Sequence, residues 1–251
     1  MSIFFAIPYI CKVANMLIRV SKRVQKVAGS LGLLSVEMLV ILFVFIIALL
    51  SFAYLIVQVI VLQQTGFDNY VFDFLKGHIS EGADDVMLFL TFLGTHKFLI
   101  PANLALIAYF LFLKKNKWYS IKVPAIALSS LGLMFGLKHL FGRPRPDLPL
   151  IFKADGLSFP SGHALFSVTF YGLLIYIIYQ TAMNKIVKAA LIVFLVVLVI
   201  VIGFTRVYLR VHYASDVIAG FCVGFMWLVF ALVILNRLER FSQKRIDATM
   251  Q

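Results

Sequence analysis

The sequence predicts an all-α polytopic membrane protein in which six transmembrane helices form a bundle. The chain is 62% hydrophobic with a mean hydropathy of +0.99, which is far too apolar for an ordinary soluble domain. Long apolar segments alternate with short polar ones, and positive charge gathers in alternate connections. The net charge of +12 is therefore explained by membrane topology, and we expect no nucleic-acid partner.

Residues 1–35 precede the first long apolar segment and carry cationic and apolar side chains on opposite helical faces. This pattern predicts an amphipathic cytoplasmic segment on the membrane surface, with a cytoplasmic tail that only obeys topology as an equal alternative. No basic region precedes the apolar run at 3–11, so we expect no cleaved signal peptide. Cys11 and Cys222 indicate neither a disulfide framework nor a metal cluster.

The first two spans are separated by a long polar connection. Residues 38–62 contain no charge and exceed the ~20 residues needed to cross a bilayer, so they form the first predicted span. Residues 63–85 follow, with a short interfacial helix for which Asp68 is the expected N-cap. The apolar run at 86–93 is too short to cross alone, and after a break the second span is predicted at 98–113.

The other four spans are predicted at residues 121–141, 160–179, 191–204 and 217–235. The six spans together define a membrane domain at 36–237, followed by a basic cytoplasmic tail at 238–251. The sequence shows no internal repeat and no low-complexity segment.

Consecutive spans cross the membrane in opposite directions, and this alternation (span parity) brings four segments to one side of the membrane. They are the end of the third span, the start of the fourth, the end of the fifth and the start of the sixth. The opposite face carries 15 of the 23 Lys and Arg residues and three of the 11 Asp and Glu residues, which accounts for the whole net charge. The positive-inside rule makes that face cytoplasmic, together with both termini. The four converging segments are therefore expected on the outer side.

A cluster of ionisable residues between the fifth and sixth apolar segments contains Arg206, His212 and Asp216. Charge at the end of an apolar segment is costly and indicates function. On a helix, the spacing of His212 and Asp216 would stack the two side chains, so that the carboxylate fixes the tautomer of the imidazole. Such a histidine can act as a nucleophile. Arg206 adds a planar donor fork suited to phosphate.

Two further segments on this face complete a phosphoryl-transfer site, which needs cations, a nucleophile and an acid. Lys138 and Arg145, at the end of the third span, supply cations. Ser161 and Gly162 begin the fourth helix, where amides without intrahelical acceptors can bind an anion. His163 is left as the proton donor.

Three motifs carry a resemblance to a known family. They are Lys138-x6-Arg145-Pro146, Pro160-Ser161-Gly162-His163 and Arg206-x5-His212-x3-Asp216. In this order and spacing they resemble the signature of the type 2 phosphatidic acid phosphatase family, integral-membrane branch. The layout of spans is similar from residue 38 to 235. Thr205 stands where the family usually has Ser, and it keeps the hydroxyl.

The resemblance implies a metal-independent phosphatase with no cofactor that works through a phosphohistidine on His212, with Asp216 orienting it and His163 as acid and then base. The implied phosphate ligands are Lys138, Arg145, Ser161, Gly162 and Arg206. The implied substrate is a membrane lipid phosphomonoester or diphosphate at the outer leaflet of a bacterial inner membrane. Isoprenoid diphosphates and glycerophospholipid phosphates rank first, ahead of lipid A modification.

Two alternatives remain open from the sequence. A phosphohistidine can pass its phosphoryl group to a lipid or sugar acceptor, which would make the protein a phosphotransferase. A non-catalytic lipid-phosphate binder or transporter could use the same cations, but it would need neither a nucleophile nor an acid. The oligomeric state is left open. Nearby ionisable residues are predicted to be interface anchors or packing residues: His78, His96, His139, Arg143 and Arg210.

Overall fold

The computed structural model describes residues 35–249 except 78, 80, 148 and 151–154. In this part of the chain all the regular structure is helical, and six helices are long and apolar enough to cross a membrane, which confirms the predicted fold class. The predicted amphipathic segment at 1–35 lies almost wholly outside the described residues, and so does His78.

The first predicted span corresponds to α2 (Val36–Leu55) and the π-helical turn η1 (Ile56–Val61) that continues it. The chain divides into two compact units at residue 46, within α2. The described residues of the first unit carry exposed apolar side chains, as expected of a segment that meets lipid. In the second unit, Leu55 and Val59 are buried and pack with Phe159.

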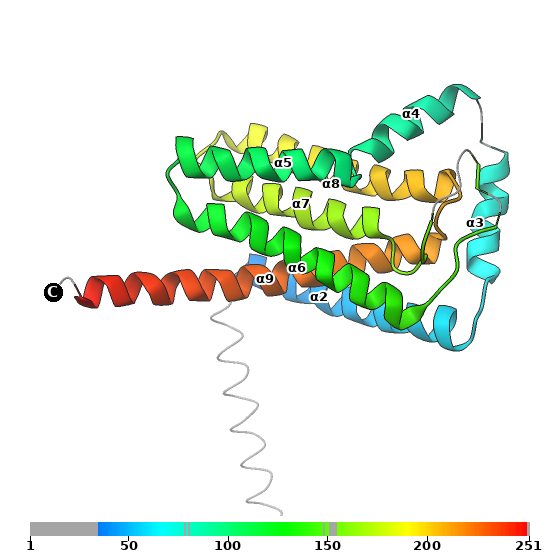
Figure 1. The fold of residues 1–251 in the computed structure, drawn as a ribbon, viewed down its shortest axis with the longest axis horizontal. Coiled ribbons are helices and arrows are strands. Elements are labelled where there is room, and N and C mark those ends of the chain that lie inside the picture. Colours follow the sequence, from blue (N-terminus) through cyan, green and yellow to red (C-terminus); the bar gives the residue numbers. More distant parts are fainter. Residues whose placement is uncertain (1–34, 78, 80, 148, 151–154, 250–251) are drawn as a thin grey trace, which may run out of the picture. The chain divides into compact units, whose positions relative to one another are not determined.

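The second predicted span, at 98–113, corresponds to α5 (His96–Ala108) and the π-helical turn η2 (Tyr109–Leu113). It is preceded by α3 (Gly66–Lys76) and α4 (Glu81–Phe92), and a break separates α4 from α5 (Figure 1). The predicted break is confirmed by the turn at 93–95. A Cβ on Gly94 would lie 2.5 Å from Ile202 Cγ2, so the turn packs closely on α8.

Asp68 has a different place from the predicted one. Thr65 occupies the N-cap position of α3, and Asp68 lies inside the first turn with its residue 1% exposed. A buried carboxylate needs partners, so its contacts become part of the site described below.

The remaining four spans are α6 (Lys117–Phe141), α7 (Gly162–Gln180), α8 (Lys185–Tyr208) and α9 (Ala214–Thr249). The side chains of Asn116 and Asn184 cap α6 and α8 by accepting backbone N–H groups. Gly142 ends α6 with a φ of 62°, a left-handed conformation that glycine adopts without strain. The chain then turns into the loop that carries Arg143 and Arg145.

Helix α7 is the centre of the second unit, because it packs against α6, α8 and α9 (Figure 1). Its contact with α9 is close: a Cβ on Gly220 would lie 2.6 Å from the carbonyl oxygen of Ser161. A Cβ on Gly224 would lie 2.8 Å from the carbonyl oxygen of Leu165. These glycines bring the starts of α7 and α9 together, and with them the second and third motifs.

Helix α9 runs through the predicted boundary between the membrane domain and the basic tail at 237/238. Near the start of α6, the Lys122 ammonium donates to Asn236 Oδ1 at 2.7 Å and to Glu239 Oε2 at 2.6 Å. The Lys122 side chain is 3% exposed and that of Glu239 is 23% exposed, so this is a partly buried ion pair between α6 and α9. Like the ion pairs of Arg143 with Asp68 and Asp216, it joins residues that are far apart in the sequence.

Candidate active site

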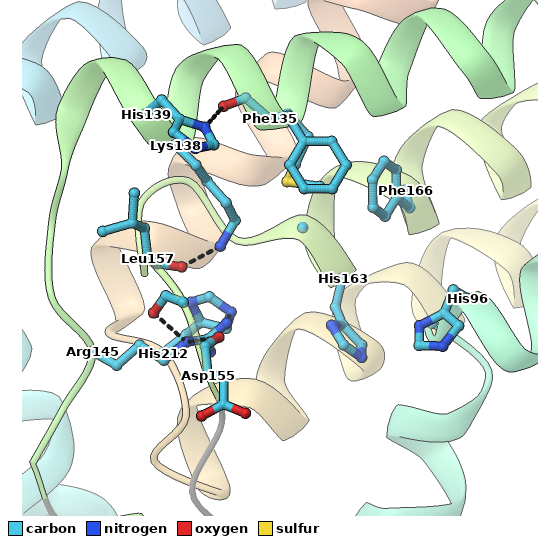
Figure 2. Close-up of a pocket in the computed structure, with 14 residues that line it drawn as sticks. His96, Phe135, Lys138, His139, Arg145, Asp155, Leu157, His163, Phe166 and His212 are labelled. Atoms are coloured by element: carbon cyan, nitrogen blue, oxygen red, sulfur yellow. Dashed lines mark hydrogen bonds between the residues drawn. The ribbon is translucent and has the colours of Figure 1, made fainter.

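A cavity of about 360 Å³ opens where the end of α6, the loop before α7 and the turn before α9 meet (Figure 2). Five of the predicted site residues line it: Lys138, Arg145, Gly162, His163 and His212. The other three do not line it and are at most 3% exposed: Ser161, Arg206 and Asp216. The four segments that span parity placed on one face therefore meet in the structure.

His212 and Asp216 form a pair, but not along a helix as predicted. His212 lies in the turn between α8 and α9, and α9 begins at Ala214. Asp216, in the first turn of α9, accepts the backbone N–H of Tyr213 through Oδ2 at 2.9 Å, as in a capping box. This contact brings Asp216 Oδ2 to 3.5 Å from His212 Nδ1.

Two hydrogen-bond partners assign the tautomer of His212. The Ser158 hydroxyl donates its proton to Asp216 Oδ2 and lies 3.2 Å from His212 Nδ1, so its oxygen accepts from that nitrogen. On the other side of the ring, Arg145 Nη1 lies 3.2 Å from Nε2 and can only donate. The proton is therefore on Nδ1, and the Nε2 lone pair is directed to the Arg145 side of the cavity.

Burial lowers the pKa of His212 from 6.5 to about 4, because the imidazolium would lose its hydration. The hydrogen bond and charge of Asp216 act in the opposite direction, and the cations Arg145 and Arg206 add to the lowering. Burial also lowers the pKa of Arg145. His212 is thus neutral at physiological pH, which is the state in which Nε2 is nucleophilic.

The three predicted phosphate-binding cations are each held by neutral oxygen atoms. Lys138 donates to the carbonyl of Leu157, and Arg145 Nε donates to the carbonyls of Asp155 and Gly156, both at 3.1 Å. Arg206 Nη1 donates to the hydroxyl of Thr91 at 2.6 Å. None of these partners is a carboxylate, so the positive charge remains available for an anion.

Buried polar atoms without a hydrogen-bond partner concentrate in this region. Among the described residues, such atoms include Ser161 Oγ, His163 Nε2 and Arg206 Nε, each on a predicted site residue. An unpaired buried polar atom is costly, and at a functional site it is typical of a group whose partner is a ligand.

One predicted donor is already used. The Ser161 amide donates to the carbonyl oxygen of Asp216 at 2.9 Å, so it ties α7 to α9. Gly162 is the first residue of α7, where amides have no intrahelical acceptor, and it lines the cavity. The predicted anion site at this helix start therefore depends on Gly162 and on the Ser161 hydroxyl.

Several residues that contact the site were not predicted from the sequence. Arg143 was predicted to be an interface anchor, but its side chain is 10% exposed and forms ion pairs with Asp216 at 2.6 Å and Asp68 at 2.8 Å. Ser158 and Thr91 also contact site residues and belong to no motif. The one signal in the sequence was the position of Arg143 inside the first motif.

His96 and His139 were predicted to be anchoring or packing residues, and both line the cavity. Figure 2 shows His96 on the α5 side, beyond His163, and His139 next to Lys138 at the end of α6. His139 Nδ1 lies 2.8 Å from the carbonyl oxygen of Phe135. Both residues are exposed, so they lie at the edge of the cavity.

A second, largely apolar cavity of about 450 Å³ lies between α5, α6 and α7. His96 and Phe166 line both cavities, so the two adjoin. The second cavity is lined mainly by aliphatic and aromatic side chains. Its polar lining residues are His96, Asn103, Ser130 and Thr169. A molecule with a polar head and an apolar chain fits this combination.

The described residues contain no group of three or more His, Cys, Asp or Glu side chains placed to hold a metal ion.

Comparison with known proteins gives three findings. Residues 119–240 match the sequence model of the PAP2 superfamily. The chain is 29% identical over 163 residues to phosphatidylglycerophosphatase B of Bacillus subtilis (strain 168), a match that covers 64% of this chain and 79% of that protein. Two solved structures are also similar, and they agree with the six-span helical fold.

The first is a transmembrane PAP2 type phosphatidylglycerolphosphate phosphatase from Bacillus subtilis. It matches with a TM-score of 0.68 and 23% identity over 80% of this chain and 98% of that chain. The second is LpxE of Aquifex aeolicus, with a TM-score of 0.51 and 27% identity over 65% of this chain and 93% of that chain.

Proposed function

The match at residues 119–240 places this chain in the PAP2 superfamily, as its three motifs predicted, and we propose that it removes the terminal phosphate of a membrane lipid through a phosphohistidine on His212. The observation that carries the proposal is the state of His212. Its ring is neutral, is protonated on Nδ1 toward Asp216 and Ser158, and directs the Nε2 lone pair to the side of the cavity where Arg145 lies.

The first step is attack of His212 Nε2 on phosphorus, in line with the bond to the lipid oxygen. The N–P bond forms as the P–O bond breaks, and the lipid oxygen takes a proton from His163. In the structure, Arg145 Nη1 donates to His212 Nε2 at 3.2 Å. A phosphate oxygen accepts the same N–H group, so substrate binding releases the nucleophile while it recruits the cation.

The second step is hydrolysis of the phosphohistidine. His163 has lost its proton in the first step and now takes one from water, whose oxygen attacks phosphorus while the N–P bond breaks. His163 suits both roles because its buried Nε2 has no protein partner. The Nδ1 proton of His212 stays on the ring throughout, and Asp216 stabilises the positive charge that the ring carries as the phosphohistidine forms.

Lys138, Arg145 and Arg206 stabilise the negative charge that develops on the equatorial oxygens. Arg206 still has an unpaired Nε, and Ser161 has an unpaired hydroxyl. We propose that these groups and the Gly162 amide complete the phosphate site. Because three cations already neutralise the phosphate, the reaction needs no metal ion.

A lipid substrate is favoured by the apolar cavity between α5, α6 and α7. It adjoins the polar cavity at His96 and Phe166, so an acyl or isoprenoid chain in the apolar cavity extends from a phosphate in the polar cavity. The similarity to phosphatidylglycerophosphatase B makes phosphatidylglycerol phosphate the first substrate to test. Isoprenoid diphosphate and phosphatidic acid follow, with lipid A modification behind.

Charge asymmetry supports the placement of the site at the outer leaflet of a bacterial inner membrane, with both termini cytoplasmic. We also propose residues 36–237 as the phosphatase domain. The basic tail at 238–251, which belongs to α9 as far as Thr249, is then on the cytoplasmic side, where cationic residues contact anionic lipid head groups.

Phosphate release from lipids in detergent tests the proposal. Phosphatidylglycerol phosphate, undecaprenyl diphosphate and phosphatidic acid are compared with short-chain analogues and p-nitrophenyl phosphate, each with and without an acceptor lipid. We expect the highest kcat/KM for a long-chain lipid. Equal kcat/KM for long-chain and soluble esters would contradict the role of the apolar cavity. Phosphoryl transfer to the acceptor without release of phosphate would show a phosphotransferase instead.

A further inference from the structure

A buried carboxylate from outside the matched region 119–240 contacts Arg143, which binds the site residue Asp216. Asp68, in α3, is 1% exposed, and its carboxylate accepts three hydrogen bonds from two of the described residues, Ser215 and Arg143. Oδ1 accepts the Ser215 N–H at 2.9 Å, and Oδ2 accepts the Ser215 hydroxyl at 2.7 Å and Arg143 Nη2 at 2.8 Å. The contact with Arg143 is also an ion pair, because the carboxylate and the guanidinium carry opposite charges.

Arg143 connects Asp68 to the carboxylate that orients the nucleophile. Its Nη2 is held by Asp68, and its Nη1 donates to Asp216 Oδ1 at 2.6 Å and to the Ser215 hydroxyl at 2.8 Å. The guanidinium also lies 4.0 Å from the ring centroid of Tyr213, which limits its rotation. One planar cation is therefore shared between two buried carboxylates.

The two carboxylate oxygens of Asp216 have different partners, and this difference matters for the reaction. Arg143 takes Oδ1, so that Oδ2 is left for Ser158, the Tyr213 amide and His212. An arginine fork in a buried site tends to bind a carboxylate with two parallel N–H···O bonds. If Arg143 bound Asp216 in that way, Oδ2 would turn toward the guanidinium and away from His212.

We propose that Asp68 and Arg143 are positioning residues for the proposed phosphatase reaction: Asp68 holds one arm of the Arg143 fork so that Arg143 binds Asp216 through Oδ1 alone and leaves Oδ2 to orient His212. The inference rests on the proposed function of His212. It gives α3, a helix outside the family match, a defined part in the activity of the site.

If the Asp68–Arg143 ion pair had only a structural role, its loss would affect stability and turnover differently. In that case Asp68 only fastens α3 to the bundle, and its loss would lower stability without a specific change in turnover. The partly buried Lys122–Glu239 ion pair provides the matched control, because it also joins two helices and touches no residue of the cavity.

The test compares Asp68→Asn, Arg143→Lys, Arg143→Gln, the double variant Asp68→Asn/Arg143→Gln and the control Glu239→Gln in detergent, using whichever long-chain lipid phosphate the wild type hydrolyses. For each, kcat, KM, the rate of phosphoenzyme formation and the thermal midpoint are measured. Wild type and His212→Ala are run beside them.

We expect Asp68→Asn to lower kcat and phosphoenzyme formation by about tenfold or more while KM stays within about twofold, because the orientation of His212 changes and phosphate binding does not. Arg143→Lys should lose a similar factor, since a point charge cannot divide two carboxylates as a fork does. The double variant should be no slower than Arg143→Gln, because Asp68 acts through Arg143. Glu239→Gln should lower only the thermal midpoint.

Wild-type kcat in folded Asp68→Asn, or in folded Arg143→Lys if Asp68→Asn does not fold, would overturn the positioning role. Additive losses in the double variant would also overturn it, since they would show that Asp68 does not act through Arg143. Absence of phosphate release by the wild type from every lipid would instead overturn the proposed function.

Discussion

The hydroxyl of Ser158 donates its proton to Asp216 Oδ2, although the two residues are far apart in the sequence. Ser158 Oγ lies 3.2 Å from His212 Nδ1, whereas Asp216 Oδ2 lies 3.5 Å from the same nitrogen. At 3.5 Å a nitrogen–oxygen contact is a weak hydrogen bond at best. Ser158 therefore transmits much of the orienting effect of Asp216 to the imidazole.

Replacement of Ser158 by alanine should consequently lower kcat. A hydrogen bond to a charged group contributes about 1.5–3 kcal/mol, which corresponds to a loss of about tenfold to a hundredfold. KM should change little, because Ser158 does not line the cavity. Ser129→Ala is the control, since it removes a hydroxyl that accepts from Trp227 Nε1 at 3.0 Å, away from the site. An unchanged kcat in Ser158→Ala would mean that the direct contact is sufficient.

Loss of the nucleophile and loss of its orienting carboxylate should differ in degree. We expect His212→Ala to abolish turnover and phosphoenzyme formation in a folded protein, and Asp216→Asn to retain residual activity after a loss on the order of 10²–10⁴-fold. Asp216→Asn should also unfold at a lower temperature, because Arg143 loses one of its two carboxylate partners. Phosphate release and a trapped phosphoenzyme measure the two effects. Substantial turnover by His212→Ala would exclude the phosphohistidine.

The protonation of His212 gives a prediction about pH. Its pKa is lowered from 6.5 to about 4 by burial, so between these values unfolding takes up a proton and stability falls as the pH falls. Acylation of the neutral imidazole by diethylpyrocarbonate should follow a midpoint near 4 in the folded protein and near 6.5 in the denatured chain. Peptide mapping by mass spectrometry reads the modification at His212. A folded midpoint near 6.5 would show that the ring is hydrated.

Much of this arrangement could be predicted from the sequence, because apolar segment length and loop charge report directly on the membrane. Span parity alone brought Lys138, His163, Arg206 and His212 to one face, and the structure places them around one region. The break before α5 and the helix start at Gly162 were also predictable, since glycine and the polar residues beside it interrupt an apolar pattern.

The supporting contacts could not be predicted in the same way. Asp68 lies in α3, and Arg143 and Ser158 lie at opposite ends of the connection between α6 and α7. Each is of a residue type that is ordinary at a membrane interface or in a loop. Only tertiary packing shows that the Asp68 carboxylate is buried and that Arg143 reaches it. The pairing of His212 with Asp216 was expected for the wrong geometric reason, because helical spacing also fits a turn that leads into a helix start.

Metal independence can be tested directly. With Lys138, Arg145 and Arg206 around the phosphate, activity should survive exhaustive treatment with EDTA and should not increase with added Mg²⁺. Vanadate should inhibit, because it adopts a trigonal bipyramid similar to the transition state. Phosphate release before and after chelation measures the effect. Activity lost in EDTA and restored by Mg²⁺ would contradict the proposed neutralisation by side chains.

The orientation of the protein in the membrane can be decided from two exposed positions that are predicted to lie on opposite sides of it. Asp147 lies in the loop between α6 and α7, and Met183 lies in the connection between α7 and α8. The predicted cytoplasmic face carries the whole net charge, so the loop with Asp147 should be outside and Met183 inside. Single-cysteine variants at these positions, made after replacement of Cys11 and Cys222 by serine, are treated in intact cells with an impermeant maleimide. We expect Asp147→Cys to react at once and Met183→Cys to react only after permeabilisation. The reverse pattern would place His212 on the cytoplasmic side, and an outer-leaflet substrate would then be excluded.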